Sequence, residues 1–454
     1  MARYDAHDLS RFDSIQLCMP DFHSVPRGKV VAGEFKETLV KDGLDCWNGT
    51  PLVGPNCEPP YSLPELCAAY NSHELRPCLE TLTPWPWASS EKRQVGSVLC
   101  DMYCPDGTPD LNCPRQQLQH QLKALRAEHG LVVRTAFEYE FFAFKENTLE
   151  PLGSDRMQFL DLRVWGRHQD LMSELRETLQ AMKVKVRTVQ PEFPPGQWEL
   201  TTSPYQGVTG ADVGFYVKNA VKGFLGTRGY DATFMTRPTT ESIGSGLHLN
   251  HSLWRPHAAN GEEGEEEEGG DNVLVGADSD GLAPLARHWM AGLLTHAPAL
   301  TALLSPTLNC YRRLHTLVSP SLATWGMDDR NAVVRVRRLK KDNVFLENRL
   351  ASGAASPYLA LAATVAAGRD GLRRGLQCPR AMEKSGADEI PRTLTEALTA
   401  LEGDRELGSL LGEDFVRCYV QAKREVEVGP YEQQVFANDD DRIAFERNMY
   451  FKTY

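Results

Sequence analysis

The chain has 454 residues, of which 41% are hydrophobic and 24% are charged, and its formal net charge is −12. This length allows one large domain and a smaller one, with a substantial buried core. An acidic balance of this kind excludes a basic surface for nucleic acid, so we expect no nucleic-acid partner.

Neither the first residues nor the apolar runs indicate a leader or a membrane span. The opening MARYDAHDLSRFD carries charge and no apolar core, and the chain lacks a run of about 18 apolar residues. We therefore expect a cytoplasmic protein with no membrane partner. Eleven cysteines without paired spacing favour reduced, mostly buried thiols over a disulfide framework or a zinc ribbon.

The first part of the chain is turn-rich. Residues 30–35 and 95–103 are candidate strands among proline and glycine clusters, which predicts a small β-rich domain over 1–107. A second domain then begins with a helix that has a proline near its start, leucines at helical spacing and Gly130 as its stop.

Strands and helices mix through residues 108–454, which predicts an α+β domain with a sheet covered by helices. In chain order we expect a strand at 132–144, a helix carrying Leu171 to Met182, a strand at 197–201, a helix at 209–226, a strand at 247–254, one long apolar helix at 283–304, strands within 332–350 and a helix at 357–371. The run GEEGEEEEGGDN lies in an acidic insertion, about 258–281. Because like charges repel and bury no core, we expect a mobile surface loop there.

Two acids share one face of the predicted strand FEYEFF. Since side chains alternate along a strand, Glu138 and Glu140 point one way while Tyr139 and Phe141 point the other. Burying two acids without a cation raises their pKa or destabilises the fold. Either this face is wet, or a metal ion or an arginine neutralises it.

Further polar residues share faces in the same manner. Alternation separates Glu199 from the apolar layer and places His248, Asn250 and Ser252 on one face, although a lone histidine is more often structural than a ligand. The collected acids form an oxygen-rich set with one imidazole, suited to Mg²⁺ or Mn²⁺ rather than zinc. These acids are Glu138, Glu140, Glu192, Glu199 and Glu347.

Four arginines on strand-like segments could clamp phosphate or carboxylate oxygens; they are Arg313, Arg330, Arg335 and Arg349. Carboxylates, divalent metals and arginines together are typical of phosphoryl transfer. The chain contains no GxxxxGK[ST] motif, so a nucleotide would bind outside a P-loop. In an alternative interpretation, the acids pair with the arginines in a salt-bridge network and bind no metal.

From about residue 15 to its end, the chain resembles the glutamine synthetase family of the class I type. The resemblance lies in five motifs in order: FEYEFF, EFPPGQWE, GSGLHLNHSLW, NCYRRL and ENRLASGAASPYLALAATVAAGRDGL. It implies a small β-grasp-like N-terminal domain and an antiparallel-sheet catalytic domain. It also implies two divalent ions per site, ATP, and a homo-oligomer of about twelve subunits in two hexameric rings.

The resemblance assigns roles to individual residues. Glu140, Glu192 and Glu199 would hold one metal ion, and Glu138, His248 and Glu347 the second. Arg313 and Arg349 would meet the substrate, Arg330 and Arg335 the nucleotide phosphates, and Asn250 and Ser252 the nucleotide, with Arg313 and Arg330 as catalytic residues. In this family ATP phosphorylates the γ-carboxylate of glutamate, and an amine then displaces the phosphate.

The chain departs from the family pattern at three places. Ile243 replaces an asparagine that holds the substrate backbone, Val318 and Ser319 occupy the region of a flap glutamate, and Phe345 replaces a phosphate-binding arginine. Each lost donor costs about 10² to 10³-fold in rate. Asp45 is the candidate for the ammonia-site aspartate that a neighbouring subunit supplies.

Four further stretches resemble a vertebrate lens branch of the family that keeps the fold without the activity. They are HWMAGLLTHAPAL, SPSLATWGMDD, ASPYLALAATVAAG and EIPRTLTEALTALE. Two functions follow from the resemblance. The first is a structural or chaperone-like protein that retains the metal site, has lost or weak ligase activity, and has intermediate-filament or other cytoskeletal partners. The second is an active ATP-dependent ligase that joins glutamate to ammonia or another amine.

Overall fold

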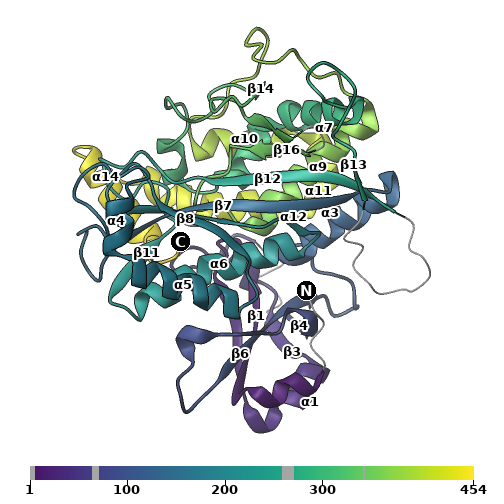
Figure 1. Ribbon diagram of the computed structural model, residues 1–454. Helices are drawn as coiled ribbons and strands as arrows, with labels where there is room; N and C mark the ends of the chain where they lie inside the picture. The colour runs from purple at the N-terminus through teal and green to yellow at the C-terminus, as the bar shows by residue number, and fades with distance from the viewer. Residues whose placement is uncertain (1–5, 64–70, 258–269, 341–342) are drawn as a thin grey trace.

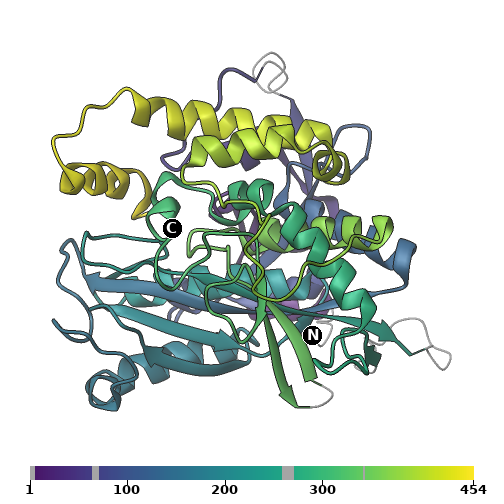
Figure 2. The ribbon, with the colours of Figure 1, turned by 90° about the horizontal axis from the view of Figure 1, so that it is seen from above.

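The computed structural model describes residues 6–63, 71–257, 270–340 and 343–454. Within these ranges the chain forms a six-stranded sheet near its N-terminus and a ten-stranded sheet in the remainder. The smaller sheet, in purple and blue, lies below the larger one in Figure 1. Figure 2 shows the green and yellow helices along one side of the larger sheet. The architecture is α+β, as expected.

The N-terminal sheet has the strand order β2-β1-β6-β4-β3, with β5 paired to β6. Its pairings are antiparallel except for the parallel pair of β1 and β6. The strands are β1 Ser14–Pro20, β2 Pro26–Ala32, β3 Leu44–Trp47, β4 Ser72–Pro77, β5 Thr83–Pro84 and β6 Val95–Tyr103. The strand expected at 95–103 is confirmed. The one expected at 30–35 ends at Ala32, because Gly33–Phe35 turns into a short 3-10 helix.

The ten-stranded sheet has the order β14-β15-β16-β12-β7-β9-β8, with β10 and β11 paired to β7 and β13 paired to β12. Its strands are β7 Val132–Lys145, β8 Val186–Pro191, β9 Gln197–Thr202, β10 Tyr205–Gln206, β11 Tyr230–Thr233, β12 Leu247–Pro256, β13 Gly270–Asn272, β14 Trp325–Met327, β15 Val334–Lys340 and β16 Asn343–Asn348. β14 pairs parallel to β15. The sheet is therefore mixed, and the expectation of a purely antiparallel sheet was wrong at this edge.

Helices cover the apolar face of the larger sheet. In this part of the chain the helices are α3 Pro114–His129, α4 Leu162–Arg167, α5 Gln169–Ala181, α6 Thr209–Gly226, α7 Pro284–Thr295, α8 Ala297–Leu304, α9 Pro357–Arg374, α10 Leu394–Gly403, α11 Arg405–Leu411, α12 Glu413–Lys423, α13 Gly429–Glu432 and α14 Asp439–Tyr450. α1 Lys36–Asp42 instead packs against strands of the N-terminal sheet. α7 and α9 approach so closely that neither glycine at the contact could carry a side chain without a shift. A Cβ added at Gly371 would lie 2.1 Å from the His288 carbonyl oxygen, and a Cβ added at Gly292 would lie 2.1 Å from the Ala367 carbonyl oxygen.

The long helix expected at 283–304 is two helices, and that prediction was wrong. Pro298 has no N–H to donate to a carbonyl one turn earlier, so α7 ends at Thr295 and α8 starts at Ala297. His296 lies at the break with 2% of its side chain exposed. Its Nε2 lies 3.0 Å from Asp370 and its Nδ1 2.6 Å from Asp404. The break therefore ties α7, α9 and α11 together.

Several other expectations concern the chain as a whole. Residues 258–269 of the acidic insertion lie outside the described residues, while Gly270–Asn272 forms β13 against β12. In the part of the chain that the structure describes, no helix is long and apolar enough to cross a bilayer. None of the ten cysteines there forms a disulfide bond, and five of them are buried.

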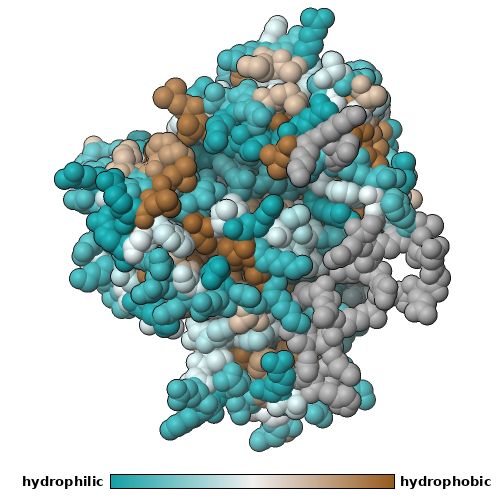
Figure 3. All heavy atoms as spheres, viewed as in Figure 1, coloured by the Kyte–Doolittle hydropathy of each residue, from teal (hydrophilic) through white to brown (hydrophobic). Residues whose placement is uncertain are grey.

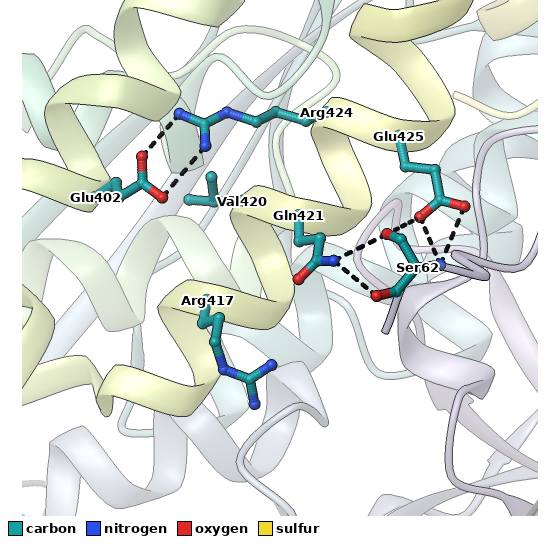
Figure 4. Close-up of a pocket in the computed structure, with 7 residues that line it drawn as sticks. All are labelled: Ser62, Glu402, Arg417, Val420, Gln421, Arg424 and Glu425. Atoms are coloured by element: carbon teal, nitrogen blue, oxygen red, sulfur yellow. Dashed lines mark hydrogen bonds and ion pairs between the residues drawn. The ribbon is translucent and has the colours of Figure 1, made fainter. Parts of the chain in front are cut away.

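A hollow lies between the N-terminal segment and the C-terminal helices (Figure 4). The Ser62 amide donates to a Glu425 carboxylate oxygen at 3.0 Å, and the Gln421 side-chain amide donates to the Ser62 carbonyl at 2.8 Å. Arg424 forms an ion pair of 2.8 Å with Glu402. Polar groups that line the hollow therefore bind one another, and the contacts of Ser62 hold the N-terminal segment to the C-terminal helices.

Candidate metal and phosphate site

Cross-strand register brings the polar faces of four strands together. Glu138 and Glu140 on β7 lie opposite His248 on β12 and Glu199 on β9, respectively. Asn250, two residues after His248, lies opposite Glu347 on β16. Paired residues in an antiparallel sheet project to the same side. The alternate residues of β7, including Phe137, Tyr139 and Phe141, and Leu247, Leu249 and Leu253 of β12 are buried in the core.

Glu138, His248 and Glu347 form the tightest group. One ligand atom from each lies within 4.8 Å of the other two. His248 Nδ1 is 3.1 Å from Glu138 Oε2 and 3.8 Å from Glu347 Oε1. Burial first, and then the charge of Arg349, lower the pKa of His248 to about 3. A neutral imidazole between two carboxylates is a suitable donor set for a divalent cation.

Glu140, Glu192 and Glu199 form an adjacent group. Glu140 Oε2 accepts a hydrogen bond of 2.8 Å from the Gly246 amide, and its Oε1 lies 3.9 Å from His248 Nδ1. Burial, followed by repulsion from Glu140, raises the pKa of Glu192 to about 7 and that of Glu199 to about 10. This group therefore has more negative charge than its surroundings neutralise, so the donor set fits a second divalent cation.

Arg313 and Arg349 lie at one side of these acids. Arg313 follows the 3-10 helix Leu308–Arg312 rather than lying on a strand, so that prediction was wrong. Its Nη2 is 3.1 Å from His248 Nε2, and its Nη1 donates to the Arg349 carbonyl at 3.2 Å. Burial lowers the pKa of Arg313 to about 10, which leaves it cationic at neutral pH. Arg349 follows β16 and forms an ion pair with Glu347.

The residues expected to bind nucleotide are brought together only in part. Arg335, on β15, lies 3.1 Å from Glu347 Oε2, and Asn250 Nδ2 donates to Glu138 Oε1 at 3.0 Å. Arg330 is exposed in the turn before β15 rather than on a strand, so that expectation was wrong. Its charge offsets part of the rise in the pKa of Glu192. Ser252 lies farther along β12 and accepts a hydrogen bond of 2.8 Å from the Trp254 indole.

The interpretation of the acids as a salt-bridge network fits one acid and not the others. Glu347 pairs with three arginines: Arg335, Arg337 and Arg349. Among the described residues, the other four acids of the two groups have no ion pair with an arginine within 4.0 Å. Arg337 was missed by the sequence analysis, although its spacing of two from Arg335 places both on one strand face.

Comparison with known protein families gives one match. Residues 111–442 match the model described as glutamine synthetase, catalytic domain. The chain belongs to the glutamine synthetase family. Lengsin from Homo sapiens is 30% identical over 457 residues, which cover 98% of this chain and 84% of lengsin. The lens branch that the sequence resembles is lengsin, and this likeness is confirmed.

Other members of the glutamine synthetase family are similar over most of the chain. Gamma-glutamylanilide synthase from Acinetobacter sp is 29% identical over 368 residues, covering 75% of this chain and 70% of that protein. A solved structure described as "GmaS/ADP complex-Conformation 1" has a TM-score of 0.82 and 26% identity, covering 98% of both chains. The chain is therefore similar both to lengsin and to a protein described as a synthase.

The three departures from the glutamine synthetase pattern lie around the acids. Ile243 is 37% exposed, next to Gly244, which has a φ of +114° and approaches Arg313 so closely that an added Cβ would lie 3.0 Å from its Cβ. The Val318 carbonyl accepts from Arg349 at 3.3 Å, and the Ser319 hydroxyl donates to the Arg313 carbonyl at 2.6 Å. Phe345 lies opposite Arg337 on the neighbouring strand.

Asp45 lies in a different part of this glutamine synthetase family member. It is exposed on β3 of the N-terminal sheet, opposite Glu74, and its carbonyl accepts from Lys29 at 2.9 Å. These contacts are with residues of the N-terminal sheet. A role in ammonia binding would therefore require the site of another subunit.

Proposed function

We propose that this chain is a lengsin-like member of the glutamine synthetase family that binds divalent ions and ATP but has lost or weak glutamate-ammonia ligase activity. The proposed binding of metal ions and ATP is supported by one observation: Glu138, His248 and Glu347 converge beside three further acids. The similarity to lengsin over 98% of the chain supports a structural or chaperone-like role.

The residues present fit the roles that the family assigns. Glu138, His248 and Glu347 would hold one Mg²⁺ or Mn²⁺, and Glu140, Glu192 and Glu199 the other. When bound, such ions neutralise charge on phosphate oxygens. Arg330 and Arg335 would bind the phosphates of ATP, near Asn250 and Ser252, and Arg313 and Arg349 would bind the carboxylate of glutamate, because guanidinium forks match such oxygens.

The loss of ligase activity is inferred from what the surrounding segments lack. The exposed Ile243 side chain cannot accept or donate a hydrogen bond to the backbone of an amino acid. The segment 312–326 contains no acid that could take a proton from an ammonium ion. Each such donor or acceptor is worth about 10² to 10³-fold in rate, and independent losses multiply.

An active ATP-dependent glutamate-ammonia or glutamate-amine ligase is the second candidate. Two observations favour it: Glu138, His248 and Glu347 converge, and Glu140 lies opposite Glu199 on the neighbouring strand. A protein without catalysis has no need to keep all these acids. The similarity to gamma-glutamylanilide synthase supports an acceptor amine other than ammonia.

An ADP-release assay distinguishes the two candidates. The protein is incubated with ATP, glutamate and Mg²⁺ or Mn²⁺, and with ammonium, methylamine or aniline in parallel. We expect nucleotide binding with turnover far below an ordinary enzyme rate of about 1 s⁻¹. The control is Glu199→Gln, which removes an expected metal ligand. Amine-dependent turnover of about 1 s⁻¹ or more, abolished in the control, would establish the ligase instead.

The quaternary proposals follow from the family alone. We propose that residues 1–107 act as a β-grasp-like domain beside a catalytic-type domain of residues 108–454, and that copies of the chain assemble as two hexameric rings in the cytoplasm. Asp45 would then belong to a neighbour's site. For the lengsin-like role we propose intermediate-filament or other cytoskeletal partners, tested by co-sedimentation with assembled filaments and by the sedimentation coefficient of the protein alone.

A further inference from the structure

Three guanidinium groups converge on a single carboxylate at the β15 and β16 side of the site. Arg335 and Arg337 lie on β15, and Arg349 follows β16; Arg335 is 3.1 Å and Arg337 3.9 Å from Glu347 Oε2. Glu347 is fully buried, while the side chains of Arg335 and Arg349 are 8% and 5% exposed. The Arg337 side chain is 27% exposed, so it is the most accessible of the three.

Arg337 is held in position by groups other than Glu347. Its Nε lies 3.0 Å from Asp328 Oδ1, and its guanidinium carbon lies 5.9 Å from the centre of the Phe345 ring, its partner across the strand pair. Asp328 has a φ of +51°, and its carboxylate also contacts Arg335 at 3.2 Å. The ring and the carboxylate keep Arg337 beside Arg335 on the same face of β15.

The charges at this place favour an incoming anion. Among the described residues, the three arginines form ion pairs only with Glu347 and Asp328. The Asp328 side chain is 68% exposed, so its attraction is screened by solvent. A metal ion bound by Glu347 would compete with the arginines for the carboxylate oxygens. Arg337 has the longest and therefore weakest contact with Glu347, so it is the arginine most easily released to bind another anion. A phosphate can accept from two neighbouring guanidinium forks at once.

We propose that Arg337 binds a nucleotide phosphate together with Arg335, and so supplies from β15 the cation that Phe345 does not supply from β16. This inference rests on the proposed nucleotide binding but assigns a residue that the family resemblance did not. Because Arg337 and Phe345 are cross-strand partners, a cation on either strand reaches the same side of the sheet.

The test compares nucleotide affinities of folded variants by calorimetry in Mn²⁺. We expect Arg337→Ala to weaken ADP binding about tenfold or more, as loss of a charge-assisted bond predicts, and to leave adenosine binding unchanged. The matched control is Arg338→Ala, because Arg338 is exposed and its neighbouring position on β15 faces the other way. This variant should bind ADP within about twofold of wild type.

A second variant restores the cation on the opposite strand. Arg337→Ala with Phe345→Arg should recover most of the lost ADP affinity, which a merely structural defect of Arg337→Ala would not allow. Unchanged ADP affinity in Arg337→Ala, or an equal loss for adenosine, would overturn the inference while leaving nucleotide binding intact. Failure of wild type to bind ADP in Mn²⁺ would overturn both the inference and the proposed function.

Discussion

Glu140 and Glu199 face each other across β7 and β9, and burial together with the Glu140 charge raises the pKa of Glu199 to about 10. Two carboxylates at this spacing cannot both ionise cheaply without a cation. The metal-free folded protein therefore holds protons here that the unfolded chain, with an ordinary glutamate pKa of about 4.3, does not hold at neutral pH.

The pH dependence of metal affinity follows from these protons. Since Glu192 titrates at about pH 7 and Glu199 at about pH 10 in the metal-free fold, Mn²⁺ must displace protons to bind. Affinity should rise between about pH 6 and 8. Calorimetry in buffers of different ionisation enthalpy measures the proton release. Binding that releases no protons at pH 6.5 would contradict this assignment.

The stability of the metal-free protein should show the opposite trend. Folded-state pKa values that are raised above the unfolded values mean that the folded state binds more protons, so stability falls as pH rises from about 5 towards 9. The Tm in EDTA should therefore decrease over this range, and Mn²⁺ should reduce the decrease. A Glu199→Gln variant, which cannot ionise at that position, should show a smaller pH dependence in EDTA.

Replacing Glu347 should destabilise the fold without metal. Glu347→Gln removes the buried carboxylate that Arg335 and Arg349 share, and breaking a buried ion pair costs about 3–5 kcal/mol. Urea unfolding in EDTA measures the loss. Glu199→Gln is the matched control, because it changes a partly buried glutamate of the same site that forms no ion pair with an arginine among the described residues. Equal destabilisation of the two variants would show that the arginines do not depend on Glu347.

The close approach of α7 and α9 should not tolerate a methyl group. Gly371→Ala would place a Cβ 2.1 Å from the His288 carbonyl, so one helix must shift, at a cost of about 1–3 kcal/mol or more. The control is Gly403→Ala at the end of α10, where no atom lies within 4 Å of the added Cβ. Thermal unfolding in EDTA compares the Tm values of the two variants, and Gly371→Ala should have the lower one. A Tm of Gly371→Ala at or above that of wild type would refute the tight contact.

Restoring a polar side chain at residue 243 should improve amino-acid binding. Ile243→Asn adds a side-chain amide beside Gly244 and Arg313, where Ile243 is 37% exposed. One added hydrogen bond to a charged group predicts about a tenfold gain in glutamate affinity. Calorimetry with glutamate in Mn²⁺ and ADP measures it, with Ile243→Leu as the control. No gain over Ile243→Leu would mean that residue 243 does not face the amino acid.

Much of the site could be predicted from alternation, because β7 and β12 place acids and core residues on opposite faces along single strands. Periodicity does not specify which strands pair, so the meeting of Glu138 with His248 and of Glu140 with Glu199 depended on the family resemblance. Arg313 was misplaced because a 3-10 turn and a short strand have similar composition. Arg337 was missed because its importance depends on its cross-strand partner, Phe345.

Alternation on β12 limits how this chain can change. His248 and Asn250 are interleaved with Leu247, Leu249 and Leu253, which are fully buried. A deletion or insertion there would exchange the two faces, so selection for folding alone preserves the spacing of the ligands. Ile243 and Val318 lie outside any strand and carry no such constraint, while Phe345 lies on β16. Changes of length are accordingly tolerated in the connecting segments, whereas on β12 they would turn His248 and Asn250 into the core.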